Sequence, residues 1–82
     1  MIVKPLKTSL VKYLKRHNLE KKYFKQLDLF KNNPIHPSLN TEKLEPFSEK
    51  LYSFRIDRKY RVIFGFHLSS EVEIIDINNH YK

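Results

Sequence analysis

Residues 51–78 read LYSFRIDRKYRVIFGFHLSSEVEIIDIN, and this stretch decides the fold class. It contains three runs rich in Tyr, Phe, Val and Ile, at residues 51–56, 60–68 and 72–78, which are separated by the polar junctions DRK and SSE. Aromatic and β-branched residues between short polar turns are typical of β-strands. The stretch therefore predicts three strands of an antiparallel meander.

The middle run divides into two sets of side chains, because alternate residues of a strand point to opposite faces of the sheet. One set is entirely apolar and is expected to face the core. The other set begins with an arginine, which is expected to project from the opposite face. The apolar set is Tyr60, Val62, Phe64 and Phe66, and the other set is Arg61, Ile63 and Gly65.

The residues before this stretch predict a short strand and two helices. Residues 1–4 form an apolar start that fits an edge strand ended by Pro5, which has no amide hydrogen for a strand ladder. Helical spacing of apolar residues predicts one helix over 8–17, with Thr8 or Ser9 as its N-cap. After Asn18, a second apolar stripe predicts a helix over 19–31; its members are Leu19, Tyr23, Phe24, Leu27 and Phe30.

Residues 32–40, NNPIHPSLN, are rich in Pro and Asn and predict the loop that leads from the helices to the strands. Two helices followed by three strands predict an α+β fold in which both helices pack on one face of a small antiparallel β-sheet. The other face of that sheet is expected to stay open. With 82 residues, the chain is expected to form a single domain over 1–82.

The composition points to a basic protein of a reducing compartment. Sixteen Lys and Arg against nine Asp and Glu give a formal net charge of +7. Such a charge favours a polyanion or an acidic protein as partner, although basic domains also use charge for solubility. The absence of Cys excludes disulfides and thiolate zinc sites. Charges interrupt the apolar N-terminus, so neither a signal peptide nor a membrane span is expected, and the cytoplasm is the expected location.

Several side chains are candidates for binding or cutting RNA. A guanidinium group on the open face, from Arg61 or Arg55, matches the paired oxygens of a phosphate, or alternatively pairs with a neighbouring acid. Arg58 and Lys59 at the predicted turn are candidates for contacts with backbone phosphates. The remaining candidates are His80, which can transfer a proton, and Tyr81, which can stack a base.

Alternatives remain open for the histidines. A histidine near a C-terminus, such as His80, is often an exposed bystander. His17, His36 and His67 are interpreted as bystanders. No HExxH motif, Gly-rich phosphate loop or paired His and Cys spacing is present. The sequence therefore contains no motif of a metallohydrolase or a nucleotide-binding protein.

Several stretches, in the same order, resemble the RelE/ParE superfamily of toxins, especially the branch that includes RelE, YoeB and YafQ. Residues 41–66, TEKLEPFSEKLYSFRIDRKYRVIFGF, and 72–82, VEIIDINNHYK, are similar to the family's KL pair, aromatic strand, short turn, YRVIF and closing DI-x-x-H. Residues 32–39, NNPIHPSL, resemble the family's NP-containing loop. The resemblance implies the toxin of a type II toxin–antitoxin system, an mRNA interferase that cuts mRNA on the ribosome and inhibits translation.

The resemblance also implies a role for each site residue. Arg61 falls on the family's phosphate-binding arginine and His80 on the histidine that acts as general acid. Glu42 lies where relatives carry a candidate general base, and Glu45 is close enough to compete with it. Arg55 is similar to the basic residue before the turn, and Tyr81 to a terminal aromatic residue. At the positions of a lysine pair used by RelE, this sequence has Tyr52 and Phe54, so a lysine base is not expected.

The chemistry implied by the resemblance needs no metal or cofactor. A base removes the proton of a ribose 2′-hydroxyl, the oxygen attacks the adjacent phosphate, and an acid protonates the departing 5′-oxygen. The expected partners are the ribosome with its mRNA and a cognate antitoxin whose acidic or amphipathic segment covers the site. The first helix, with Lys12, Lys15 and Arg16, is then expected to bind ribosomal RNA. The alternatives are a ParE-like toxin that inhibits DNA gyrase and a non-catalytic, basic RNA-binding domain.

Overall fold

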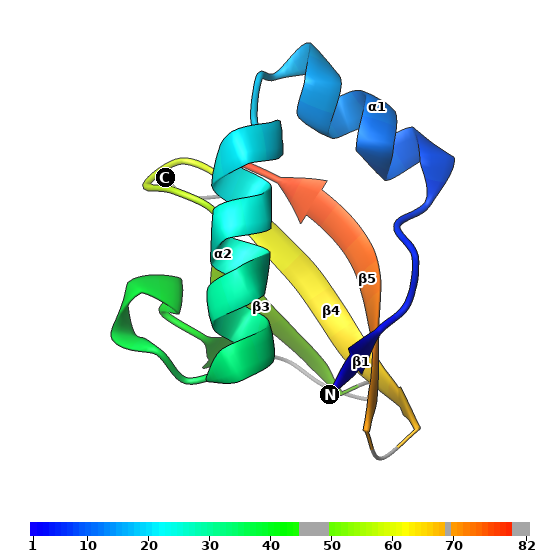
Figure 1. Cartoon of the computed structure of the whole chain (residues 1–82), viewed down its shortest axis with the longest axis vertical. Coiled ribbons are helices and arrows are strands. Elements are labelled where there is room, and N and C mark those ends of the chain that lie inside the picture. The colour runs from blue at the N-terminus through cyan, green and yellow to red at the C-terminus, as the bar shows by residue number, and fades with distance from the viewer. Residues whose placement is uncertain (45–49, 69, 80–82) are drawn as a thin grey trace.

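The computed structural model describes residues 1–44, 50–68 and 70–79, and shows two helices beside a five-stranded sheet (Figure 1). The chain turns from helices to strands through a short 3-10 helix, η1, which lies in the predicted loop. The elements are β1 (Ile2–Val3), α1 (Thr8–Arg16), α2 (Glu20–Asn32), η1 (Pro37–Leu39), β2 (Glu42–Lys43), β3 (Leu51–Arg55), β4 (Arg61–Leu68) and β5 (Glu71–Asn78).

The strand order in the sheet is β1-β5-β4-β3-β2. The three predicted C-terminal strands pair in antiparallel fashion, as expected. The N-terminal edge strand is also confirmed, but β1 runs parallel to β5, so the sheet is mixed and not purely antiparallel. The second edge strand, β2, was not predicted from the sequence, and it pairs antiparallel with β3. A strand of two residues is too short to have an alternation of its own.

The two helices lie where the apolar spacing predicts them, but α1 begins differently. Its N-cap is Lys7, which makes no side-chain cap, so the prediction of a Thr8 or Ser9 cap is wrong. The reason is that the carbonyl of Lys7 already accepts the amides of Leu10 and Val11. Asn18 ends the pattern in a left-handed conformation, with φ of 54°. No helix of the part of the chain that the structure describes is long and apolar enough to cross a membrane.

One apolar core lies between the helices and a single face of the sheet. Figure 1 shows α2 across β3 and β4, and α1 over the end of β5. The ring of Phe30 on α2 contacts the rings of Phe54 and Phe64, with centroids 4.7 and 4.9 Å apart. Both helices therefore cover the face that the strand pattern predicts. The buried core residues are Leu10, Leu14, Leu19, Tyr23, Leu27, Phe30, Leu39, Phe54, Ile56, Val62, Phe64, Val72, Ile74 and Ile77.

Two aromatic residues predicted to be core residues are exposed. Phe24 is 59% exposed, because the side of α2 that packs on the sheet carries Tyr23, Leu27 and Phe30 and leaves Phe24 at its border. Phe66 is 50% exposed, although its ring still packs edge-on against Phe64 on the same face of the sheet. The alternation thus predicts the direction of Phe66 correctly but not how far the helices extend over it.

Candidate functional site

The face of the sheet opposite the helices, here called the outer face, carries two rows of side chains. The row at one end of the strands contains Arg55, Arg61 and Asn78, which are direct partners across β3, β4 and β5. The next row contains Glu42, Ser53, Ile63 and Asp76 on four successive strands. The two rows lie side by side, because residues two apart on a strand share a face.

The two arginines of the first row are the central feature of this face. Arg55 and Arg61 are partners in the register of β3 and β4, and both are half-buried. Directly opposed residues on neighbouring strands have Cβ atoms ~5 Å apart, and like charges at such a position repel each other. The pair concentrates positive potential at one spot, which suits a bound anion such as a phosphate.

Asn78 helps to orient Arg61. The Nε of Arg61 donates to Oδ1 of Asn78 at 3.4 Å, and Nδ2 of Asn78 donates to Oδ2 of Asp76 at 3.0 Å. The amide therefore links the arginine to a carboxylate without bringing the carboxylate into the first row. Asn78 was not predicted as a site residue. The sequence signal for it is the alternation at the end of the last strand, where Ile77 points to the core and Asn78 therefore points to the outer face, beside Arg61.

A β-bulge on β5 shapes the outer face. Ile63 pairs with Asp76 and Phe64 pairs with Ile74, so Ile75 is an extra residue on β5. Ile75 and Asp76 are both exposed, whereas Ile74 and Ile77 on either side are buried in the core. Bulges of this kind re-aim side chains and increase strand twist. Here the bulge puts Ile75 over Gly65, where an added Cβ atom would lie 3.4 Å from Cδ1 of Ile75.

The middle of the outer face is not fully open, although neither α1 nor α2 covers it (Figure 1). Ser53 is 0% exposed and Ile63 is 7% exposed. The Oγ atom of Ser53 is buried and has no hydrogen-bond partner within residues 1–44, 50–68 and 70–79. The prediction of an open face therefore holds for the borders of the sheet, where Glu42 and Asp76 are exposed, and not for its centre.

Gln26 of α2 holds the end of β3 that carries Arg55. Its side chain is 7% exposed, and Nε2 donates to the carbonyl of Arg55 at 2.8 Å and to the carbonyl of Ser38 at 3.2 Å. One buried amide thus ties α2, η1 and β3 together, from the opposite side of the sheet to the Arg55 guanidinium. The apolar stripe of the predicted helix gave no indication of this polar residue.

The structure places the predicted base Glu42 on β2, at the edge of the sheet. Its partner is Ser53 on β3. Strand β3 therefore lies between Glu42 and the strand of Arg61, and β3 and β4 lie between Glu42 and Asp76. Neighbouring strands are ~4.8 Å apart, so the backbones at Glu42 and Arg61 are about 10 Å or more apart. Glu42 is exposed, and its Oε1 accepts a hydrogen bond from Nδ2 of Asn40 at 3.3 Å.

The other predicted catalytic residues, His80, Tyr81 and the competing base Glu45, lie outside the described residues. The structure does describe where β5 ends. Its last residue, Asn78, is the partner of Arg61, so β5 ends beside the arginine pair.

The predicted RNA-binding residues form two exposed groups that the fold brings close to each other. Lys12, Lys15 and Arg16 are exposed on α1, and Arg58 and Lys59 are exposed in the turn between β3 and β4. Tyr13 and Tyr60 connect these two elements through an edge-on ring contact, with centroids 6.2 Å apart.

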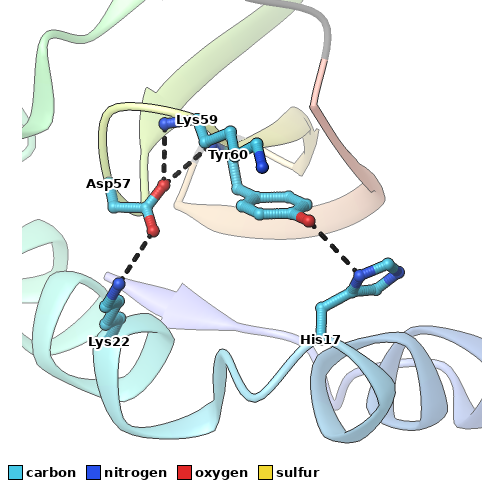
Figure 2. A network of polar contacts seen from close by, with 5 residues as sticks. All are labelled: His17, Lys22, Asp57, Lys59 and Tyr60. Atoms are coloured by element: carbon cyan, nitrogen blue, oxygen red, sulfur yellow. Dashed lines mark hydrogen bonds and ion pairs between the residues drawn. The ribbon is translucent and has the colours of Figure 1, made fainter.

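The turn between β3 and β4 is fixed by Asp57 (Figure 2). Oδ1 of Asp57 accepts the amides of Lys59 and Tyr60, both at 2.8 Å, and Oδ2 pairs with Nζ of Lys22 on α2 at 3.1 Å. Burial opposes ionisation of this carboxyl group, but the two amides and the Lys22 ammonium prevail and lower its pKa. The turn is therefore held in place against α2.

Two of the histidines interpreted as bystanders make specific contacts. Nδ1 of His17 lies 3.3 Å from the Tyr60 hydroxyl (Figure 2). The His17 ring also lies against Tyr13, with centroids 4.3 Å apart. Nδ1 of His36 accepts the amide of Ser38 and caps η1. Within the part of the chain that the structure describes, no group of three or more His, Asp or Glu side chains could hold a metal ion.

Comparisons with known proteins add the fold relationship. No protein-family model matches the sequence, and no curated protein matches it. A solved structure described as a YoeB/ParE toxin from Agrobacterium tumefaciens matches with a TM-score of 0.72 and 19% identity, over 99% of this chain and 100% of that chain. A YoeB dimer from Staphylococcus aureus matches with a TM-score of 0.66 and 22% identity, over 98% of this chain and 94% of that chain. The two helices on one face of a mixed sheet thus form the same fold as these solved YoeB and YoeB/ParE toxin structures.

Proposed function

We propose that this chain is the toxin of a type II toxin–antitoxin system and that it cuts mRNA on the ribosome in the cytoplasm. The observation that carries the proposal is the half-buried pair of Arg55 and Arg61 on the outer face, at the end of β5. The net charge of +7 and the exposed cations of α1 and the β3–β4 turn support a nucleic-acid partner. The similarity to a YoeB/ParE toxin and to YoeB supports the class of protein.

The proposed reaction is an internal transfer of a phosphate ester. A base takes the proton of the ribose 2′-hydroxyl, and the 2′-oxygen forms a bond to the adjacent phosphorus. The bond from phosphorus to the 5′-oxygen of the next nucleotide breaks, and an acid gives that oxygen a proton. The products are a 2′,3′-cyclic phosphate and a 5′-hydroxyl, so atoms and charges balance.

Each candidate residue has one role in this proposal. Arg61, with Arg55 beside it, stabilises the negative charge that grows on the phosphorane oxygens. His80 is the general acid, Glu42 or Glu45 is the base, and the Tyr81 ring stacks a base of the mRNA. The half-buried position strengthens the contribution of Arg61, because a guanidinium group shielded from water interacts more strongly with a developing charge.

Glu42 lies at the edge of the sheet, so it can act as the general base only if the RNA strand crosses the second row of the outer face. Such a path brings a ribose near β2 while the following phosphate meets the arginine pair. Glu42→Gln and Glu45→Gln, compared in single-turnover cleavage at saturating ribosome, separate the two candidates. Only the true base slows the reaction, by a factor on the order of 100 to 10,000.

The central test measures cleavage of mRNA on purified ribosomes with the wild-type chain, Arg61→Ala and His80→Gln. We expect both variants to lose activity by a factor on the order of 100 or more, with unchanged thermal unfolding. Lys25→Ala, which removes an exposed charge from α2, is the matched control and keeps activity. Unchanged cleavage by His80→Gln means that the acid is another group, and absence of cleavage by the wild-type chain contradicts the proposal. A gyrase supercoiling assay with the same preparations tests the ParE-like alternative.

The surface that suits the proposed antitoxin lies on the helical side of the molecule and not over the arginine pair, where the sequence led us to expect it. A groove of about 350 Å³ lies between α1, α2 and the N-terminal segment. Its walls are mainly apolar, the exposed ring of Phe24 lies at its border, and Lys4, Lys15 and Lys31 line it. Apolar walls with lysines at the edge fit an amphipathic segment with acidic residues on its polar side.

The partner proposal is tested by co-expression with small acidic proteins encoded next to the toxin. We expect a stable complex that neutralises growth arrest and weakens as salt rises. Phe24→Ala should weaken it, whereas Ile35→Ala, which removes an 80% exposed apolar side chain outside the groove, should not. If both variants bind the partner as the wild type does, the antitoxin uses another surface.

A further inference from the structure

Three aromatic side chains meet at the junction of α1 with the β3–β4 turn, and Figure 2 shows two of them, His17 and Tyr60. Tyr13 and His17 lie one helical turn apart on α1, and Tyr60 directly precedes β4. The ring centroids of Tyr13 and His17 are 4.3 Å apart, those of His17 and Tyr60 are 5.5 Å apart, and those of Tyr13 and Tyr60 are 6.2 Å apart. All three rings are in mutual contact, and they are called the aromatic junction below.

The aromatic junction is a surface feature and not part of the buried core. His17 is exposed, and Tyr13 and Tyr60 are only partly buried against the core. Leu14 and Val62, the neighbours of Tyr13 and Arg61 in sequence, already close the core at this end, with 2% and 0% exposure. Packing of α1 on the sheet therefore accounts for the buried edges of the two tyrosines, but it does not require an exposed imidazole in contact with them.

A hydrogen bond keeps the exposed ring in place. Nδ1 of His17 lies 3.3 Å from the hydroxyl of Tyr60, and Tyr60 itself belongs to the turn that Asp57 and Lys22 fix against α2. Partial burial and the nearby Tyr60 and Asp76 raise the pKa of Tyr13, so its ring stays neutral. The junction thus presents a rigid aromatic surface, which loses little conformational entropy when a flat ligand stacks on it.

Cations surround the junction on both elements. Lys12 and Arg16 lie one helical turn apart near the end of α1, next to Tyr13 and to His17, which is the C-cap residue of the helix. Lys59 precedes Tyr60, and Arg61 follows it on the outer face. Aromatic rings bordered by exposed cations are the combination that binds single-stranded nucleic acid, with bases on the rings and phosphates on the cations.

We propose that the aromatic junction binds an unpaired base of the RNA strand whose phosphate occupies the arginine pair. The inference rests on the proposed function, because it takes RNA as the ligand of the outer face. Tyr60 and Arg61 are consecutive residues that point to opposite sides of the sheet, so one strand of RNA reaches both by passing around the end of the sheet at the β3–β4 turn. The base stacks on His17 and Tyr60, and Lys12, Arg16 and Lys59 hold the flanking phosphates.

Stacking predicts which RNA binds best. Every base has an aromatic face, so the junction tolerates any sequence but favours the larger purines. A strand without bases keeps all of its phosphates and loses only the stacking. Comparison of oligoadenylate with an abasic strand of equal length therefore separates the junction from the general attraction of a charge of +7.

The test measures binding of fluorescein-labelled 2′-O-methyl oligoadenylate, which has no 2′-hydroxyl and cannot be cut. We expect His17→Ala and Tyr60→Leu to lower its affinity by about 10-fold or more and to leave binding of the abasic strand unchanged. Tyr60→Phe keeps the ring and loses only the bond to His17, and we expect its affinity to stay within roughly threefold of the wild type.

The control is Phe66→Leu, which removes another half-exposed ring from the same strand. Phe66 lies six residues beyond Tyr60, or about 20 Å along β4, and its loss should not change affinity for oligoadenylate. Thermal unfolding shows whether Tyr60→Leu folds, and His17→Ala, which alters an exposed side chain, provides the result if it does not.

Three outcomes overturn the inference. The first is equal wild-type affinity for oligoadenylate and the abasic strand, and the second is wild-type affinity in His17→Ala. The third is loss of antitoxin binding in His17→Ala with RNA binding intact, which makes the junction a protein contact. Ribosomal cleavage, measured in parallel, separates this inference from the proposed function: wild-type cleavage with base-independent binding contradicts only the inference.

Discussion

Arg61 can be exchanged for lysine without a change in formal charge, which separates the shape of the cation from its charge. A guanidinium group presents two parallel N–H donors to a phosphate, and an ammonium group does not. Arg61→Lys also loses the Nε bond to Asn78. We expect ribosomal cleavage to slow by about 10- to 100-fold, with the unfolding free energy within ~0.5 kcal/mol of the wild type.

The matched control for that exchange is Lys25→Arg on the exposed side of α2, which should leave cleavage unchanged. Wild-type cleavage by Arg61→Lys means that charge alone is required at this position. That result would also contradict the binding of the phosphate by two parallel N–H donors of the guanidinium group.

Gly65 is the one glycine of the chain, and its neighbours decide what it tolerates. A Cβ atom there would lie 3.4 Å from Cδ1 of Ile75, 3.6 Å from Cδ2 of Leu51 and 3.6 Å from the carbonyl oxygen of Lys50. These are ordinary contacts, and the nearest atom ends a flexible, exposed side chain. We expect Gly65→Ala to raise the unfolding free energy by up to ~1 kcal/mol, because alanine lowers the entropy of the unfolded chain.

Urea denaturation of Gly65→Ala and Gly65→Val measures this expectation. The branched side chain of valine extends into the space that Ile75 occupies and should cost about 1–3 kcal/mol relative to alanine. Destabilisation by alanine itself, beyond ~1 kcal/mol, means that Ile75 cannot move and that the bulge is rigid.

At the scale of elements, Gln26 connects α2, η1 and β3 through two hydrogen bonds to carbonyl oxygens. Gln26→Leu keeps the volume but leaves the carbonyls of Arg55 and Ser38 without this donor. We expect the unfolding free energy to fall by about 1–3 kcal/mol. Because β3 carries Arg55, affinity for RNA should also fall.

The control for Gln26 is Asn32→Ala on the same helix, where an exposed amide donates to the carbonyl of Asp28 at 2.9 Å. That bond competes with water, so its loss should change the unfolding free energy by less than ~0.5 kcal/mol. Equal effects of the two variants in urea denaturation contradict a special role for the buried amide.

The elements themselves could largely be predicted from the sequence, because apolar side chains recur at helical spacing before residue 32 and at strand spacing after residue 50. The bulge on β5 has a signal too. Buried Val72 and Ile74 are two residues apart, but the next buried residue, Ile77, is three apart, and one extra residue explains the change. Cross-element bonds such as those of Gln26 and His17 could not be predicted, since they depend on how the elements pack.

At the scale of the whole molecule, Tyr23 makes the unfolding free energy fall as the pH becomes alkaline. The side chain is 2% exposed, and burial raises its pKa from the ordinary value of 10.0 to about 12. In the unfolded chain the hydroxyl ionises first, so this contribution to stability is complete below pH ~10 and is lost as pH rises towards the folded value. We expect the unfolding free energy to fall by up to ~1.4 kcal/mol per pH unit in that window.

Urea denaturation across the alkaline range, with Tyr23→Phe for comparison, measures this loss. Phenylalanine fills the same space and does not ionise, so its curve should be flatter over that window. Identical slopes for both proteins mean that other tyrosines account for the alkaline transition.

The candidate site could be predicted only in part, because its composition depends on the order and register of the strands in the whole sheet. Arg61 was assigned to the outer face by alternation within one strand, and the structure confirms that direction. Which residues join it depends on the order of strands in the sheet. The pairing of Arg61 with both Arg55 and Asn78, and the edge position of Glu42, follow from register across four strands and from no single stretch of sequence.

The pairing of β1 with β5 has a consequence for synthesis. Ile2 and Val3 leave the ribosome long before their partners Glu71 and Val72. Strand β5 also brings Val72, Ile74 and Ile77 to the core. A nascent chain without residues 71–78 therefore lacks both the partner of its first strand and a wall of its interior, and closure of so long a loop is slow. The complete sheet, and with it the outer face, can thus form only after residues 71–78 have left the ribosome.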